Sequence, residues 1–203
     1  MQAIGHIFTQ IAAPARSALF LGCLLTMLAC SENAPDMTAQ APARPAAKCL
    51  PGGSLQVSTY GALESEIEWA SGDMTCEGMQ RPNKQGARLR FAGSARDADE
   101  LRELAFIIAL PDLQKGQSAK ELVTRVTLIE EDSARFYSTQ EVDICWTNIE
   151  QHIDESLTAA DAPSYRVSGL LYCVAPIAEL NGTGSVTLSD MTFSGQLTWS
   201  TTP

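Results

Sequence analysis

Beyond its first quarter, the chain is built from short runs in which apolar and polar residues alternate. In the clearest run, Leu63, Ile67 and Trp69 share one phase, and three glutamates occupy the other. In a second run, Leu89 and Phe91 alternate with arginines. A period of two residues is typical of an antiparallel strand that buries one face, so both runs are predicted to be such strands.

Other runs predict strands of different kinds. Leu104–Leu110 and Leu122–Ile129 are apolar but mixed in phase, which predicts central strands covered on both faces. Arg135–Thr139 is predicted to be a short strand and Tyr165–Val174 a long one. Near the C-terminus the apolar positions change phase at Ser189-Asp190, which indicates a β-bulge or a bend between sheets.

One helix is predicted among these strands. Thr147 and Glu150 fit a capping box, in which two side chains satisfy backbone N–H groups of the first turn. Ile149, Ile153 and Leu157 then recur at every fourth residue, as the apolar face of a short helix would.

Together these elements predict an all-β domain. The fold expected is an antiparallel β-sandwich, immunoglobulin-like or jelly-roll-like, with one short helix. About eight strands, frequent turn residues and the lack of strand–helix–strand alternation favour it. Residues 48–203 are predicted to form this single domain, because their number is near the usual size of a domain with one core.

The first thirty residues carry a different pattern. Arg16 precedes the apolar run Ser17–Ala29, which ends at Cys30 before polar residues. The run is too short for a membrane-spanning helix, which needs roughly 20 apolar residues. A basic residue, a short apolar core and a small residue at its end are typical of a secretory signal peptide, predicted here over residues 1–29.

The segment Met27-Leu28-Ala29-Cys30 resembles the lipobox of bacterial lipoprotein precursors. The resemblance implies cleavage before Cys30, thioether lipidation of its sulfur and acylation of the new amino terminus, so that Cys30 joins the protein to membrane lipid. Ser31 after the cysteine is similar to the pattern of lipoproteins sent to the outer membrane, which implies a lipid-anchored place in the bacterial cell envelope. The alternative is ordinary signal cleavage nearby, which would leave a soluble periplasmic or secreted protein.

A tether is predicted between the anchor and the folded domain. Residues 31–47 are rich in Ala and Pro and contain one large apolar residue, Met37, so they cannot bury enough surface to offset chain entropy. Together with Cys30 they form the predicted segment 30–47. A flexible strand of this length spans on the order of 25 Å, which would hold the domain close to a membrane.

Four of the six cysteines are predicted to form disulfides. Cys23 would be lost with the leader and Cys30 would be lipidated, and an even number in an exported domain predicts two bridges. Three pairings are possible, and we favour local ones, because each closes a loop of roughly 28 residues and would stabilise by about 3 to 4 kcal/mol. The favoured pairs are Cys49–Cys76 and Cys145–Cys173.

Charge excludes some partners. The chain has 14 basic and 24 acidic residues, for a net charge of −10. Such an acidic chain argues against nucleic acid as a partner and against adhesion to anionic lipid headgroups. The lipid anchor would therefore have to hold the protein at the membrane alone.

No catalytic constellation is apparent. His152 is the one histidine beyond the leader, and no Gly-x-Ser-x-Gly elbow accompanies it, so a Ser-His-Asp triad is not predicted. On the predicted helix, only Glu155 has a ligand spacing from His152, and we interpret both as a solvated face. The cysteines contain no close Cys-x-x-Cys pair, so neither a metal ion nor a cofactor is predicted.

Two acidic clusters and several aromatic residues were weighed as sites. The clusters at residues 97–100 and 130–132 could bind calcium, but they lack the spaced ligands of an EF-hand and are interpreted as solubilising charge. Trp146 is predicted to pack against a disulfide beside Cys145. Trp69 and Trp199 share phase with core positions.

These observations favour a non-enzymatic envelope lipoprotein whose sandwich binds an envelope protein or a glycan. The alternative is a secreted or periplasmic carboxylate-based hydrolase acting on polysaccharide or peptidoglycan. Such an enzyme needs two carboxylates that flank a groove, and the sequence does not pair any two.

Overall fold

The computed structural model describes residues 48–83, 85–140, 142–156 and 163–200, which contain thirteen strands and no helix. The predicted all-β class is confirmed. The predicted leader at residues 1–29 and tether at residues 30–47 lie outside the described residues. The strands are β1 (Ser54–Gly61), β2 (Ser65–Ala70), β3 (Met74–Gln80), β4 (Ala87–Asp97), β5 (Glu100–Leu110), β6 (Ala119–Val123), β7 (Arg125–Glu130), β8 (Arg135–Ser138), β9 (Cys145–Asp154), β10 (Ser164–Cys173), β11 (Ile177–Glu179), β12 (Ser185–Leu188) and β13 (Met191–Thr198).

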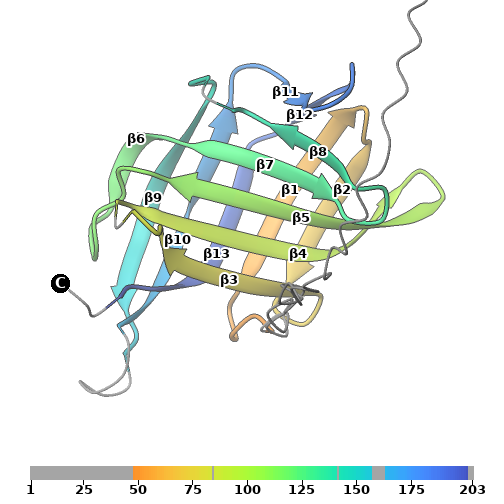
Figure 1. Cartoon of the computed structure of the whole chain (residues 1–203). Helices are drawn as coiled ribbons and strands as arrows, with labels where there is room; N and C mark the ends of the chain where they lie inside the picture. The colour runs from red at the N-terminus through yellow and green to blue at the C-terminus, as the bar shows by residue number, and fades with distance from the viewer. Residues whose placement is uncertain (1–47, 84, 141, 157–162, 201–203) are drawn as a thin grey trace, which may run out of the picture. The chain divides into compact units, whose positions relative to one another are not determined.

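The thirteen described strands belong to one hydrogen-bonded sheet, which folds over into two facing layers in a sandwich-like arrangement. Figure 1 shows β3, β4, β5, β7 and β8 side by side in one layer, with β1, β2, β13, β10 and β9 crossing behind them. The ring centroids of Phe91 (β4) and Phe193 (β13) lie 6.0 Å apart, as do those of Trp69 (β2) and Phe106 (β5). These aromatic contacts place the hydrophobic core between the layers.

A bend in the last strand run joins the two layers, at the predicted position. β12 pairs with β11 and the end of β1, whereas β13 pairs with the start of β1 and with β10. At the bend, the Ser189 N–H donates to the Ser58 carbonyl (2.9 Å), and the Ser58 N–H donates to Ser189 Oγ (2.8 Å). Leu188 before the bend and Met191 after it are both buried. The phase change therefore keeps apolar side chains in the core on both sides of the bend.

The predicted helix is wrong, because the same residues form strand β9. β9 pairs with β10, and the register shifts so that Ser168 faces Gln151 while Gly169 faces Ile149. This bulge makes Ile149 and His152 both buried, three residues apart, and leaves Ile153 51% exposed. Ile149 and Ile153, the predicted apolar face of the helix, therefore do not share one face of the strand. Leu157 lies outside the described residues.

The run predicted as one central strand at Leu122–Ile129 is two strands in different layers. β6 pairs with β9, whereas β7 pairs with β5 and β8. The break falls at Thr124, which is buried, and its hydroxyl hydrogen-bonds the Thr147 hydroxyl at 2.8 Å. β7 alternates between buried and half-buried positions, so it buries one face rather than two. The central position predicted for Leu104–Leu110 is correct, since β5 lies between β4 and β7.

Both favoured disulfides are present. Cys49–Cys76 ties the segment before β1 to β3, and Cys145–Cys173 joins directly opposite residues of β9 and β10, with Cα atoms 4.0 Å apart. The contacts within Arg44–Pro203 form one compact unit that contains every strand. This unit has its own core and both disulfides, and we expect it to fold without the residues that precede it.

The contact between β3 and β13 requires glycine at position 78. A Cβ there would lie 2.0 Å from the Gln196 carbonyl oxygen and 2.8 Å from Leu89 Cδ2. We therefore expect Gly78→Ala to lower the free energy of unfolding by about 2 kcal/mol, since a backbone has to move. Gly72→Ala is the control, because a Cβ there meets nothing within 4 Å. Equal effects of both substitutions in urea denaturation would contradict the proposed close contact.

Candidate functional site

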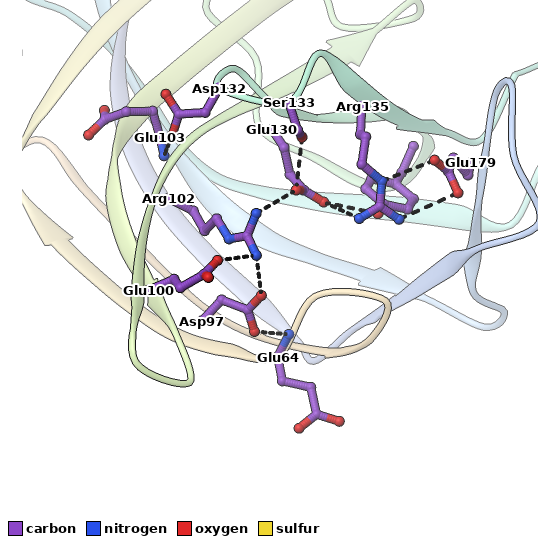
Figure 2. Close-up of polar contacts among 11 residues, drawn as sticks. Glu64, Asp97, Glu100, Arg102, Glu103, Glu130, Asp132, Ser133, Arg135 and Glu179 are labelled. Carbon is purple, nitrogen blue, oxygen red and sulfur yellow. Dashed lines mark hydrogen bonds and ion pairs between the residues drawn. The ribbon is translucent and has the colours of Figure 1, made fainter.

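The two acidic clusters noted in the sequence lie close together in space, around an arginine. Figure 2 shows the Arg102 guanidinium between the β4–β5 hairpin and the end of β7. It lies 2.6 Å from Glu100, 3.6 Å from Asp97 and 3.8 Å from Glu130, nitrogen to oxygen. Part of the acidic charge is therefore neutralised within the protein, which corrects its interpretation as purely solubilising.

Glu130 is the buried centre of this cluster. Its side chain is 2% exposed, and it accepts hydrogen bonds from Tyr137 Oη (3.0 Å), Ser133 Oγ (3.1 Å) and the Arg135 guanidinium (3.3 Å). Burial raises the pKa of Tyr137, and its hydrogen bond to Glu130 raises this pKa further. The sequence carried a signal for this burial, because Glu130 shares phase with Val126 and Leu128 on β7.

A second carboxylate extends the network to β11. Arg135 Nε lies 3.1 Å from Glu179 Oε1, and the Gly184 N–H donates to Glu179 Oε2 at 3.0 Å. The hydrogen bond from Arg135 is the main cause of a lowered pKa at Glu179. Arginine and carboxylate side chains from β5, β7, β8 and β11 thus join into one network. Within the described ranges no group of three or more His, Cys, Asp or Glu side chains has a geometry suited to a metal ion.

His152 is a structural residue of the core edge, not part of a solvated face. It is 8% exposed, and Nε2 accepts hydrogen bonds from the Gly116 N–H (3.3 Å) and Trp199 Nε1 (3.2 Å). Nδ1 donates to the Gln117 carbonyl (3.1 Å), so the ring is neutral. Burial lowers its pKa and outweighs the opposing effect of the bond to Gln117.

The residues next to His152 do not join it in a site. Glu155, which the helix would have placed beside it, instead pairs with Arg166 at 2.7 Å. Asp154 has a lowered pKa, chiefly because the Ser156 side chain donates a hydrogen bond to it. His152 therefore holds the loop at Gly116-Gln117 rather than a ligand.

Trp146 lies on the outer face of β9 rather than against the core. Its ring stacks on Tyr172 of β10, with centroids 6.1 Å apart and an angle of 26° between the rings. Cys145, its neighbour, points into the core. Trp69 and Trp199 are buried, as their phase predicted.

An open groove of about 660 Å³ is lined by β3, β13 and the segment before β1. β13 pairs with β3 at a single position, Thr198 opposite Met79, and Lys48 forms a bridge to Thr75. The walls of the groove come from the segment around the Cys49–Cys76 disulfide, from β3 and from β13. Apolar surface predominates on the walls, with Lys48 and Arg81 beside it. Its size falls within the roughly 300–1,000 Å³ of ligand pockets in proteins.

Sequence reasoning missed this groove. Its walls come from residues 48–50, 76–82 and 196–200, three segments that are distant in the chain. None of these segments carries a binding motif, and no periodicity relates them. Only the spatial order of β3 and β13 brings them together.

Comparison with known proteins returned no match to a protein family, a curated protein or a solved structure. Among the described residues, no helix has the length and apolar composition needed to cross a membrane. Cys30, the predicted lipidation site, lies outside the described residues.

Glu130→Ala is expected to lower the free energy of unfolding by about 3 kcal/mol, because it removes the buried partner of two arginines and of Tyr137. The matched control is Glu131→Ala on the adjacent residue, which pairs with Arg90 and has a 43% exposed side chain. That pair is solvent-screened, and its loss should cost less than about 1 kcal/mol. Chemical denaturation of both variants measures the difference, and equal losses would contradict a central role for Glu130.

The stability of the domain should fall as pH drops below about 6.5, the usual pKa of histidine. Because the pKa of His152 is lowered in the folded state, the unfolded chain binds the proton first as the pH falls. The free energy of unfolding then decreases by up to about 1.4 kcal/mol per pH unit. Residues 44–203 contain no other histidine. His152→Gln should flatten the dependence of unfolding free energy on pH between 7 and 5.5. An unchanged slope in that variant would show that another group is responsible.

Proposed function

We propose that this protein is an exported, lipid-anchored binding protein of the bacterial cell envelope. The leader at residues 1–29 and the lipobox-like segment ending at Cys30 support export and anchoring. The two disulfides support an oxidising compartment, where such bridges persist. Ser31 favours the outer membrane as the destination.

The observation that carries the binding role is the groove between β3 and β13. It is mostly apolar, has the size of a ligand site and is bordered by two basic side chains. It also adjoins Lys48, where the predicted tether would enter the domain. The partner that we propose is a component of the cell envelope. For the type of all-β fold, we propose an immunoglobulin-like or jelly-roll-like sandwich.

The alternative, a carboxylate-based hydrolase, has less support. Such an enzyme needs two carboxylates that are free to act as acid and as base or nucleophile. The most buried carboxylate, Glu130, instead pairs with Arg102 and Arg135, and Glu179 pairs with Arg135. We therefore propose binding without catalysis.

Cys30→Ala should abolish incorporation of a radiolabelled fatty acid and release the protein from the membrane fraction, because the thioether acceptor is lost. Cys23→Ala is the matched control, since Cys23 lies within the predicted leader and should leave label and fractionation unchanged. Labelling of the Cys30→Ala chain, or equal loss from both variants, would refute the anchor. Intact mass of the mature protein gives the cleavage site independently.

A further inference from the structure

The basic side chains at the groove differ from most arginines of the domain. Lys48 and Arg81 line the groove and make no ion pair with a carboxylate among the described residues. Arg88 does not line the groove, although its guanidinium lies 3.7 Å from Met79 Sδ. Elsewhere, five arginines pair with carboxylates. They are Arg90, Arg102, Arg125, Arg135 and Arg166. The groove lining therefore carries two basic side chains and one acidic one, in a chain with net charge −10.

The groove walls beside these basic side chains are apolar. Leu50 is 43% exposed, and Met79, Pro82 and the Cys49–Cys76 disulfide continue the surface. Glu77 is the acidic residue among the lining side chains. The groove thus combines a strip that favours hydrocarbon with cationic groups that favour an anion.

We propose that this groove binds a single-chain amphiphile with an anionic head, specifically a long-chain fatty acid. The acyl chain would lie along Leu50, Met79 and Pro82, and its carboxylate would pair with Arg81 just beyond the end of β3, while Lys48, opposite Thr75, would lie towards the other end of the groove. The charge of the groove is complementary to that head, whereas the acidic remainder of the chain repels it. This inference deepens the binding role proposed above and rests on it.

Binding of sodium laurate to residues 31–203, purified with both disulfides formed and without detergent, tests the proposal by calorimetry. We expect saturable binding of one laurate per chain, at least tenfold tighter than that of dodecyltrimethylammonium, which has the same chain and the opposite charge. Acetate, which has the head without the chain, should not bind measurably. These arms separate the contributions of the head and of the hydrocarbon.

Variants locate the site. Lys48→Gln combined with Arg81→Gln should weaken laurate binding at least tenfold, and Met79→Asp should weaken it by a similar factor through the apolar wall. Lys120→Gln is the matched control, because Lys120 is exposed on β6 and does not line the groove. Melting temperatures of all variants show whether each one is folded.

Three outcomes would overturn the proposal. They are a lack of saturable laurate binding below its micelle concentration, equal affinity for the cationic amphiphile, and equal affinity in the Lys48/Arg81 variant and the Lys120 control. None of these outcomes depends on Cys30, because the fragment of residues 31–203 does not include it. Failure here is therefore distinguishable from failure of the anchor, which fatty-acid labelling of the whole chain reports.

Discussion

The fold depends on one strand run that serves both layers, β12 and β13 with the bend at Ser189-Asp190. Most of the described strands bury one apolar face, so each layer needs the other to cover it. The bend lets the run pair with both halves of β1 while its apolar side chains stay in the core. Beyond the bend, β13 pairs in register with β3 at one pair of residues and packs closely on Gly78. The groove is lined from both of these strands.

The order of the strands also decides which charged side chains are paired. Glu130 can be buried only because Arg102, Arg135 and Tyr137 reach it from neighbouring strands, since an unpaired buried carboxylate would be strongly unfavourable. In this network, acidic and basic side chains neutralise one another. At the groove, Lys48 and Arg81 are not compensated in this way, so the local charge there is opposite to that of the whole chain.

Several elements could be predicted from local pattern. Leu63, Ile67 and Trp69 are buried as their alternation implied, and the phase change at Ser189-Asp190 marks a real bend. The helix prediction was wrong because it rested on the spacing of four between Ile149 and Ile153, which an extended strand also allows; in β9 a bulge between them leaves Ile149 buried and Ile153 51% exposed. The break at Thr124 was missed because the apolar run continues across it, while its two halves pair in different layers.

The sequence by itself determined the all-β class and most strand positions, because alternation is a local property of the chain. Loop length favoured the cysteine pairing that the structure contains, but it left two other pairings open. The export signal and lipid anchor also come from sequence, and they stay predictions. The tertiary structure alone decided that residues 97–102 lie beside Glu130, that His152 is a buried acceptor, and that three distant segments enclose a groove. The physical reason is that these contacts join residues far apart in the chain. Strand order and the bend between the layers bring such residues together, and neither can be read from a local pattern.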